Sequence, residues 1–416
     1  MIRRTFLKHS LKYLATWGAL FTIPESVVSE IENSLRSLYQ RSGSQVDWEH
    51  VRQQMLLDPK IAYLNTGTLG ACPRPVFQTT LETWKQLEGN PAIRGFRTLL
   101  PLAEQTRERA ADLLKADTGE IALMQNTTEG LNLVACALQF KPGDEILITN
   151  HEHPGGRVGW EYLEKYHQIR ITRIDLDHQF LSADEIVEKF RRRITRNTRV
   201  LSVAHVLYTT GLKMPIRQLS HLAHEHGLLM VVDGAQVPGM LRVDLKHLAC
   251  DVYASSSHKW LLAPKGTGLL YIRREVQDQL RPVSLEGGFH AYSGHIGTRN
   301  VPALIGHGTA ILWHQSLGED QVEKRVLELS RYCYRRLQAF KRLRFLRPLD
   351  PELDSGMVAF SPLDIKNVEL ARKLEEQHII VKIVPKLNGI RISTHVYNRE
   401  KDIDRLVEAL HAAGIR

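Results

Sequence analysis

The stretch SSSHKWLLAPKGTGLLYIRR, from Ser255 to Arg274, places a lysine in an unusual setting. Lys259 follows three serines and a histidine, and Trp260 and two leucines come directly after it. A lysine on the surface needs no apolar neighbours, whereas an apolar or cationic setting lowers the pKa of an amine that has to react. The pattern therefore predicts that Lys259 is a reactive amine rather than a solvated charge.

A carboxylate follows an apolar run earlier in the chain. The run LLMVV is followed by Asp233, and Gln236 lies in the same turn. A carboxylate at the end of a buried strand is costly unless a cation meets it, and the N–H of a protonated pyridine ring is such a cation. Gln236 would then reach a hydroxyl on the same ring. The alternative for Asp233 alone is an N-cap of the next helix.

Hydroxyl groups follow the strand-like run IALM, where QNTTEG opens a helix. Thr127 and Thr128, together with the free N–H groups of a helix N-terminus, form a seat for a phosphate. Capping by Thr127 or Asn126 is the simpler alternative. His153 follows the run EILIT in the turn NHEHPGG, where it would stack on a flat ring, ligate a metal or fill the turn. No carboxylate or cysteine stands at metal spacing, so no metal site is predicted.

A reactive amine, a buried acid, a ring-stacking histidine and a phosphate seat are together the groups that pyridoxal 5′-phosphate requires. The sequence therefore predicts this cofactor. The arrangement resembles the class V aminotransferases of fold type I, a family that also contains cysteine desulfurases and isopenicillin N epimerase-like enzymes. The resemblance runs from about Tyr63 to the C-terminus, and its most specific parts are DGAQ at Asp233 and SHK at Ser257.

The resemblance implies a role for each of these residues toward the cofactor. Lys259 would form the Schiff base, Asp233 would pair with the pyridinium nitrogen, and His153 would stack on the ring; these three are the expected catalytic residues. Gln236 would hydrogen-bond the phenolic oxygen. His205, after the run RVLSVA, takes the place of a polar ring contact of many relatives, or else belongs to the core. The phosphate would be held by Thr127, Thr128, Ser257 and His258.

The resemblance also implies a substrate side and a second subunit. Arg391 in IRIS would anchor the substrate α-carboxylate, a bidentate task that suits a guanidinium group. Asn65 lies in YLNTGTLG, which is similar to the family's substrate-side loop. Thr298 in GTRN takes the place of a phosphate contact from the neighbouring subunit. A homodimer with shared active sites is therefore expected.

In the family that the sequence resembles, the freed lysine removes a proton from the substrate Cα. The expected function is transamination or epimerisation of an amino acid or an amino-acid-containing metabolite. Cysteine desulfurases need a cysteine shortly before the anchoring arginine, and HIIVKIVPKLNGIR has none, which together with the HEH turn favours the epimerase-like branch. The alternatives are a lyase of the same family and a relative that binds the cofactor without turnover. The complete residue set disfavours the second alternative.

Strand-like apolar runs alternate with segments of helical periodicity over most of the chain. The runs are IALM, EILIT, IRITRI, RVLSVA, LLMVV and GLLYI. This alternation predicts an α/β fold with a mainly parallel, seven-stranded-type sheet covered by helices on both faces. Strands near MVAF, IIVKI and GIRIS predict a smaller α/β unit after the charged helix EDQVEKRVLELSRYCYRRLQAF. We expect a signal and linker over 1–45, a large cofactor-binding domain over 46–316 and a small domain over 317–416.

The composition is that of a globular protein with an excess of basic residues. The 416 residues carry a formal net charge of +9, and 43% of them are hydrophobic. No run approaches the ~20 apolar residues of a membrane helix. The four cysteines are far apart, which predicts neither a disulfide framework nor a zinc site. The basic run KFRRRITRNTR lacks the clustered aromatics of a nucleic-acid site, and we interpret it as the solvated end of a helix.

The N-terminus resembles a twin-arginine export signal. RRTFLK, from Arg3 to Lys8, precedes an apolar stretch from Tyr13 to Ile23, a pattern that addresses folded proteins to the periplasm. Lys12 intrudes on the apolar stretch, and no clear A-x-A cleavage site follows. A periplasmic location is expected, uncleaved anchoring included. The alternatives are a basic amphipathic helix on the surface and a cytoplasmic protein.

Overall fold

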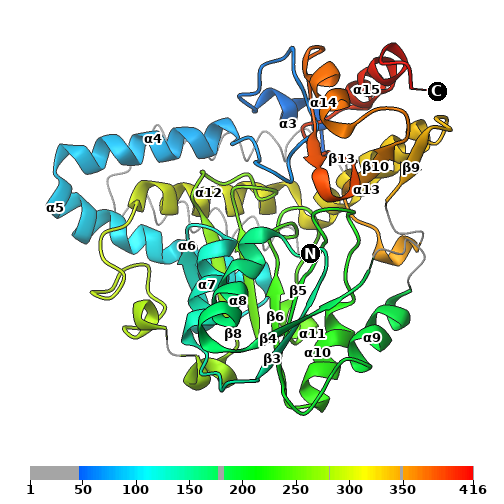
Figure 1. The fold of residues 1–416 in the computed structure, drawn as a ribbon. Helices are drawn as coiled ribbons and strands as arrows, with labels where there is room; N and C mark the ends of the chain where they lie inside the picture. The colour runs from blue at the N-terminus through cyan, green and yellow to red at the C-terminus, as the bar shows by residue number, and fades with distance from the viewer. Residues whose placement is uncertain (1–45, 177–181, 281, 347–349, 416) are drawn as a thin grey trace, which may run out of the picture.

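The computed structural model describes residues 46–176, 182–280, 282–346 and 350–415 (Figure 1). The expected signal and linker, 1–45, lie outside these residues, so the export signal stays a prediction. Among the described helices, none has the length and apolar character needed to cross a membrane.

The central sheet has seven strands, and all of them except β8 point in the same direction. Its order is β2 (Ile121–Met124), β8 (Gly268–Ile272), β7 (Val252–Ser256), β6 (Leu229–Asp233), β5 (Thr198–Ala204), β3 (Glu145–Thr149) and β4 (Arg170–Ile174). β8 is antiparallel to both of its neighbours, and the strands from β7 to β4 pair in parallel. The predicted α/β class with a mainly parallel sheet is therefore confirmed.

β7 is the strand that the sequence prediction missed. Its sequence, VYASS, is short and only weakly apolar, although all five residues are buried. A central strand is covered on both faces, so its small side chains gain burial from tertiary packing that no local pattern reveals. β7 matters for the site because Ser257, His258 and Lys259 follow it directly.

Helices cover both faces of the sheet because successive strand residues point to opposite sides. Val200, Val231 and Val252 pack with α7 (Thr127–Ala137) and α8 (Pro154–His167) on one face. Leu201, Val232 and Tyr253 belong to the core on the other face, with the helices α6 (Leu100–Leu114), α9 (Ala183–Arg191), α10 (Ile216–Glu225) and α11 (Leu245–Leu248).

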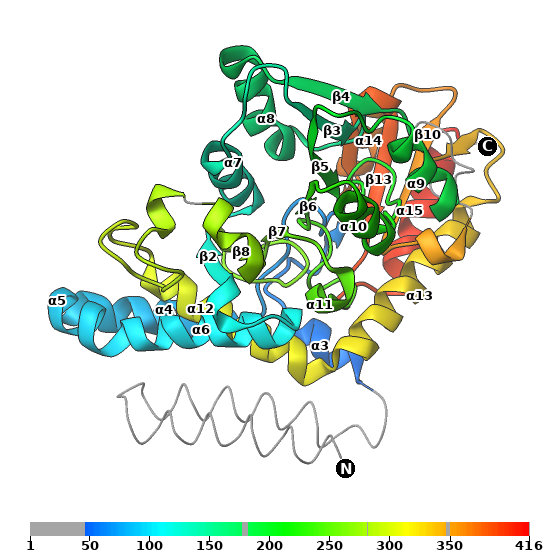
Figure 2. The ribbon, with the colours of Figure 1, turned by 90° about the horizontal axis from the view of Figure 1, so that it is seen from below.

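A layer of long helices extends beyond the sheet. α12 (Val301–Leu317) lies beside α4 (Arg74–Gly89) and α6, and α5 (Pro91–Ile93) lies at the outer end of this layer (Figures 1 and 2). The short helical segments are α3 (Trp48–Gln53), η1 (Arg94–Leu99), η2 (Thr118–Glu120), η3 (Arg274–Gln279), η4 (Val283–Leu285), η5 (Pro351–Leu353) and η6 (Pro385–Leu387).

The C-terminal part forms a second α/β unit around its own core. An antiparallel sheet has the order β12 (Lys382–Val384), β13 (Gly389–Ser393), β10 (Met357–Pro362) and β9 (Leu343–Phe345). It packs with α13 (Glu319–Leu337), α14 (Asn367–Glu375) and α15 (Glu400–Ala412). The expected run IIVKI is divided, because β11 (Ile379–Ile380) pairs instead with β1 (Ala62–Tyr63). The domain boundary expected after residue 316 falls at the end of α12 and stays a prediction.

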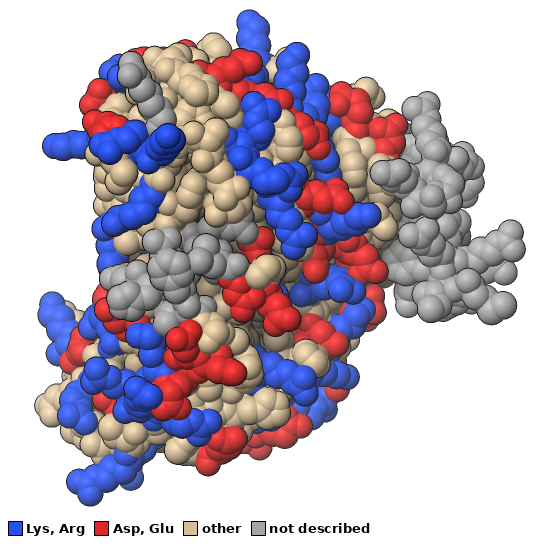
Figure 3. Space-filling model, turned by 90° about the vertical axis from the view of Figure 1, so that its right-hand side faces the viewer, with Lys and Arg blue, Asp and Glu red and all other residues tan. Residues whose placement is uncertain are grey.

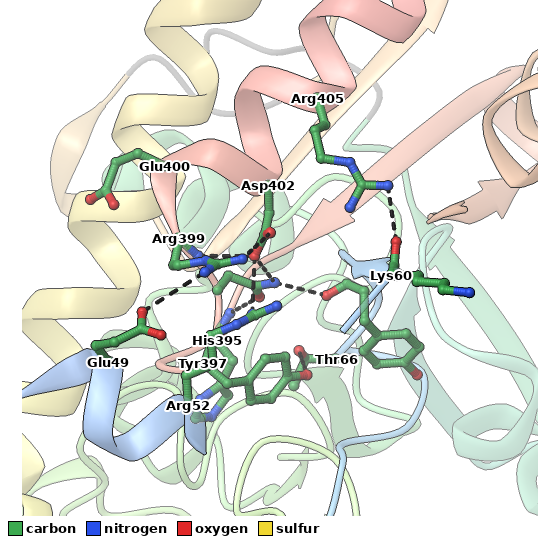
Figure 4. Close-up of polar contacts among 12 residues, drawn as sticks. Glu49, Arg52, Lys60, Thr66, His395, Tyr397, Arg399, Glu400, Asp402 and Arg405 are labelled. Atoms are coloured by element: carbon green, nitrogen blue, oxygen red, sulfur yellow. Dashed lines mark hydrogen bonds and ion pairs between the residues drawn. The ribbon is translucent and has the colours of Figure 1, made fainter. Parts of the chain in front are cut away.

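A polar network ties the N-terminal arm to the C-terminal unit (Figure 4). The buried carboxylate of Asp402 accepts from the guanidinium of Arg52 at 3.3 Å and from the backbone N–H of Arg399 at 3.0 Å. Asn398 donates its side-chain N–H to the carbonyl of Tyr63 at 3.0 Å. Because Tyr63 begins the loop that contains Asn65, this network sets the position of that loop.

Charged residues of both signs occur on the face shown in Figure 3. Within the basic run 189–199, the guanidinium groups form ion pairs with neighbouring carboxylates: Arg191 with Glu188 and Glu225, and Arg199 with Asp144. α9 ends at Arg191, within this run. The run therefore lies where the sequence interpretation placed it, at the end of a helix.

Candidate active site

The predicted residues gather where the parallel strands end. Asp233 is the last residue of β6, Lys259 follows β7, and His153 follows β3 at the start of α8. The carboxyl ends of parallel strands meet at one edge of a sheet, which is the usual ligand edge of such folds. From the other side, the loop 64–70 and β13 bring in Asn65 and Arg391.

Lys259 lies in a turn that is pressed against the loop 64–70. The N–H of Gly70 donates to the carbonyl of His258 at 2.9 Å, and a Cβ on Gly70 would lie only 1.9 Å from the carbonyl oxygen of Lys259. Burial lowers the pKa of the Lys259 amine to about 8, an effect that Asp233 opposes and Arg391 reinforces. An appreciable fraction of the amine is therefore neutral near neutral pH, as a nucleophile requires.

Asp233 is almost completely enclosed, with 7% of its surface exposed. Its Oδ1 accepts from the N–H of Ala235 at 2.9 Å, and a Cβ on Gly156 would lie 2.8 Å from its Oδ2. Burial raises the pKa of the carboxyl, and the nearby charge of Lys259 counteracts this rise. The carboxylate is thus available to a cation that enters the site. Its position is fixed by the turn that follows it and by the close approach of Gly156.

The N-terminus of α7 and the turn after β7 lie side by side, where the phosphate seat is expected. Asn126 caps the helix by accepting from the N–H of Glu129 at 2.9 Å, so capping does not occupy the threonines. The hydroxyl of Thr127 lies 2.8 Å from the hydroxyl of Ser256. The buried hydroxyl of Ser257 has no hydrogen-bond partner among the described residues.

Thr128 and His258 are the other two residues expected at the phosphate, and this role stays a prediction. A Cβ on Gly155 would lie 2.1 Å from the hydroxyl oxygen of Thr128, so the first turns of α7 and α8 approach closely. The Nδ1 of His258 lies 3.1 Å from the carbonyl oxygen of Thr267 and therefore carries the proton. Burial and the charge of Lys259 lower the pKa of His258 to about 4, so the ring is neutral.

His153 presents a neutral ring at the site. Its Nδ1 accepts from the N–H of Gly155 at 3.0 Å, which makes it the cap of α8. Burial and nearby cations lower its pKa to about 4. The ring centroid lies 5.0 Å from that of Tyr208, and the two planes are close to perpendicular. In the described part of the chain, no group of three or more His, Cys, Asp or Glu residues could hold a metal ion.

His205 is not brought into this group. Its Nδ1 lies 3.0 Å from the hydroxyl of Tyr253, and its ring lines a separate cavity of about 540 Å³ together with Lys213 and Met214. His205 follows the last residue of β5. These contacts agree with the core interpretation of His205, and its expected contact with the cofactor stays a prediction.

Two residues at the site were not singled out from the sequence. Tyr208, three positions after His205, lies beside His153, and its carbonyl accepts from Arg391 at 2.9 Å. Glu152 is buried, accepts from the hydroxyl of Thr149 at 2.6 Å, and has its pKa raised to about 8 by burial. Their positions after β5 and β3, at the ligand edge of the sheet, were the signal that could have identified them.

Arg391 and Asn65, the two residues expected on the substrate side, contact each other. The guanidinium of Arg391 donates to the side-chain oxygen of Asn65 at 3.4 Å and to the hydroxyl of Thr68 at 3.3 Å. Arg391 is only 1% exposed, and its Nε has no hydrogen-bond partner among the described residues. Burial lowers its pKa to about 10, so the group stays charged. A buried guanidinium with only neutral acceptors calls for an anionic ligand.

Gln236 has contacts that hold the site together. Its Nε2 donates to the carbonyl of Gly67 at 2.9 Å, and its Oε1 accepts from the indole N–H of Trp260 at 2.8 Å. It therefore connects the turn after β6 with the loop 64–70 and the residue after Lys259. Its expected contact with a phenolic oxygen stays a prediction.

Thr298 is exposed. It lines an open cavity of about 340 Å³ with Gln125, Glu129 and Lys265. An exposed position is what a residue that acts on a neighbouring subunit requires. The homodimer itself stays a prediction.

Pyridoxal 5′-phosphate fits the residues that the structure brings together. The unpartnered hydroxyl of Ser257 and the first turn of α7 suit its phosphate, since helix N-termini leave N–H groups free. The buried carboxylate of Asp233 suits the ring nitrogen, and the Lys259 amine, with its lowered pKa, suits the aldehyde. Each group of the cofactor thus has a chemically matched partner in this chain.

Comparisons with known proteins agree with this arrangement. Residues 62–406 match the model of the aminotransferase class-V family. The isopenicillin N epimerase of Amycolatopsis lactamdurans is 34% identical over 389 residues, which are 87% of this chain and 98% of the relative. A probable cysteine desulfurase of Pyrococcus abyssi is 28% identical, over 87% of this chain and 96% of the relative.

Solved structures share the fold. A mutant of C-DES with glycine covalently linked to its PLP cofactor superposes with a TM-score of 0.81 at 24% identity, over 86% of this chain and 98% of that one. The apo cysteine desulfurase of Thermococcus onnurineus superposes with a TM-score of 0.78 at 26% identity, over 88% of this chain and 97% of that one. The fold, the site and the matches lead to one conclusion: the chain belongs to the aminotransferase class-V family.

Proposed function

We propose that this pyridoxal-phosphate-dependent enzyme binds an amino acid, or a metabolite with a free amino-acid group, and exchanges a proton at its Cα. The observation that carries the proposal is the buried Arg391 guanidinium, which has no acidic partner among the described residues and faces the same site as Lys259. An α-carboxylate on Arg391 would orient the substrate amine toward the cofactor. When bound, the cofactor supplies an electron sink for negative charge at Cα.

The residues of the chain then have defined tasks. Lys259 would hold the cofactor, and its free amine, which needs a pKa near the working pH, would take the proton from Cα. The buried carboxylate of Asp233 would stabilise a positively charged ring nitrogen. His153, as a neutral group, would shield the ring from water.

Two differences among the relatives support the epimerase-like branch of the family for this chain. Two relatives named isopenicillin N epimerase are 34% and 33% identical to it, whereas the probable cysteine desulfurase of Pyrococcus abyssi is 28% identical. The segment between β11 and Arg391 contains no cysteine, and Cys333 is buried in the core of the C-terminal unit. A thiol nucleophile is therefore missing from the segment that supplies it in desulfurases. Epimerisation is the reaction that we favour, and transamination is the second candidate.

The first experiment is a near-visible absorption spectrum of the purified protein with added pyridoxal phosphate, before and after borohydride. We expect wild type and Lys366→Ala, a control at an exposed lysine, to show the absorption band of protein-bound cofactor. Borohydride should then attach the cofactor permanently to Lys259. Lys259→Ala should bind the cofactor without a covalent link. If wild type showed no absorption band of bound cofactor even with excess pyridoxal phosphate, the proposal would be wrong.

A second experiment identifies the reaction. Amino acids that perturb the band are incubated in deuterium oxide, and the products are analysed by chiral chromatography and mass spectrometry. Epimerisation should invert Cα and introduce one deuterium without any 2-oxo acid. A 2-oxo acid would instead indicate transamination, and loss of a side-chain group would indicate lyase chemistry.

We also propose that the enzyme is a homodimer in which Thr298 contributes to the partner's phosphate seat, and that residues 1–45 direct export. The exposure of Thr298 supports the first proposal, and the RRTFLK sequence supports the second. Light scattering tests the dimer, and a fusion of residues 1–45 to a reporter tests export. A monomer at working concentration, or a reporter retained in the cytoplasm, would contradict the respective proposal.

A further inference from the structure

Lys382 is paired with Arg391 across the C-terminal sheet. β12 and β13 are antiparallel, and Lys382 is the register partner of Arg391. Side chains of directly opposed residues point to the same face, with Cβ atoms about 5 Å apart. The neighbouring residues Ile383, Ile390 and Ile392 face the opposite way, into the hydrophobic core of the C-terminal unit. Lys382 and Arg391 therefore share the face that is turned away from that core.

The charge of Lys382 influences groups inside the active site. Together with Arg391, it is one of the cations that lower the pKa of Lys259 and of His153. Lys382 is half-buried, and burial together with the charge of Arg391 lowers its own pKa. These directions agree with the strand geometry, which places both cations on the side of the site that receives the substrate.

Lys382 has no carboxylate partner within 4 Å among the described residues, whereas Lys373 of the same unit pairs with Glu369 at 3.5 Å. The two carboxyl groups nearest to the site do not neutralise the charge of Lys382. Burial raises the pKa of Glu152 to about 8, so this group is largely protonated at neutral pH, and Asp233 faces Lys259. The third cation of this side, Arg157, is matched by Glu161 at 3.2 Å.

Two like charges directly opposite each other on a sheet destabilise it unless something compensates. The α-carboxylate that we assign to Arg391 can compensate only one of the two cations fully. A second anionic group of the substrate, reaching Lys382, would compensate the other. The arrangement therefore has the form of a site for a ligand with two acidic groups.

We infer that Lys382 forms a second anion subsite, and that the natural substrate is an amino acid or amino-acid-containing metabolite with an acidic group besides its α-carboxylate. The inference rests on the proposed function, because it assigns the α-carboxylate to Arg391. Lys382 determines specificity in this assignment: it selects among substrates, whereas Lys259 and Asp233 act on whichever substrate is bound.

The test uses ligands that lack an amine and so cannot react. Glutarate and butyrate have similar chains, but only glutarate carries a second carboxylate. Their dissociation constants for the cofactor-loaded enzyme are measured by calorimetry in wild type, Lys382→Met, Lys382→Arg and the exposed-lysine control Lys366→Met. We expect wild type and Lys366→Met to bind glutarate about tenfold tighter than butyrate, the usual effect of one charge-assisted contact.

Lys382→Met should bring the two ligands within about twofold of each other, and Lys382→Arg should keep most of the preference because the cation is retained. Equal affinities in wild type, or an undiminished preference in Lys382→Met, would overturn the inference. If Lys382→Met weakened the binding of both ligands to the same degree, the inference would also be overturned. Lys382 would then contact the same ligand carboxylate that Arg391 binds. The absorption band of Lys382→Met shows separately whether fold and cofactor loading are intact.

Discussion

The two halves of the active site are built in different ways. The half that we assign to the cofactor consists of Asp233, Lys259 and the hydroxyls and N–H groups at the start of α7 and in the turn after β7, all of which end or follow strands of one sheet. The substrate half consists of cations, Arg391 and Lys382, which belong to the C-terminal unit and meet the loop 64–70. One half is therefore local to a single sheet, whereas the other exists only where two units and an N-terminal loop come together.

This difference has a physical consequence. Phosphate recognition by a helix N-terminus needs only secondary structure and short turns, so it survives small movements between units. Carboxylate recognition by a guanidinium needs a bidentate geometry and is sensitive to shifts of about 1 Å. The loop 64–70 bonds directly to β13, where the N–H of Ser393 donates to the carbonyl of Leu64 at 2.9 Å, and the network around Asp402 supports the loop from behind (Figure 4). Changes in the two halves should therefore be separable in experiments.

The largest effect is expected in the cofactor half. Asp233→Asn removes the buried charge that meets the ring nitrogen while keeping the shape of the side chain. Loss of one partner of a buried charge pair predicts a fall in kcat of about 10³-fold. Steady-state kinetics and the absorption band are measured together. Unchanged kcat in a fully loaded Asp233→Asn enzyme would show that the aspartate is only a structural residue.

Arg391→Met should damage the substrate half and leave the cofactor half intact. Because the carboxylate loses its guanidinium, kcat/KM should fall about 10²-fold, while the absorption band of the loaded enzyme stays as in wild type. Arg344→Met, at an exposed position on β9, is the matched control. If Arg391→Met lost the absorption band of the bound cofactor to the same extent as it lost activity, the two halves would not be separable.

The pH dependence of cofactor loading tests the amine itself. The pKa of Lys259 is lowered to about 8, so the neutral fraction rises from about one tenth at pH 7 to about nine tenths at pH 9. The rate at which the apoenzyme forms its covalent link should therefore rise about tenfold over this range, with a midpoint near pH 8. Stopped-flow absorbance measures the rate. A midpoint near 10.5 would indicate an unperturbed lysine.

Asp402→Asn tests the network behind the loop 64–70. Without its charge, the contacts to Arg52 and Arg399 weaken, and the loop that presents Asn65 to Arg391 is held less firmly. We expect KM to rise about fivefold and the melting temperature to fall, with cofactor loading unchanged. A loss of loading that parallels the rise in KM would contradict the separation of the two halves.

The smallest effect is expected at Cys72, a thiol close to the loop 64–70. Its Sγ donates to the carbonyl of Leu262 at 3.3 Å, and burial raises its pKa to about 11. A thiol that stays protonated is a poor nucleophile. Cys72→Ala should therefore keep activity within about twofold, with sulfide release from cysteine measured in parallel. A large loss of activity would reopen the desulfurase alternative.

Much of the fold could be predicted from the sequence because its signals are local. The strands β2, β3, β4, β5, β6 and β8 are apolar runs, and α13 and α15 show clear helical periodicity. β7, by contrast, is built from small polar residues whose burial depends on strands from elsewhere in the chain. The short β9 and the pairing of β11 with β1 also depend on contacts between distant segments.

For the site, the sequence determined the residues of the cofactor half, because Lys259, Asp233, Thr127 and Ser257 stand directly after strands or at a helix start. Only the tertiary structure decided that His205 contacts Tyr253, that Tyr208 lies beside His153, and that Lys382 stands opposite Arg391. The reason is physical. A residue at the end of a strand inherits its place from the sheet, whereas the direction of a side chain in a turn, and its neighbours across a register, depend on packing between segments far apart in the sequence.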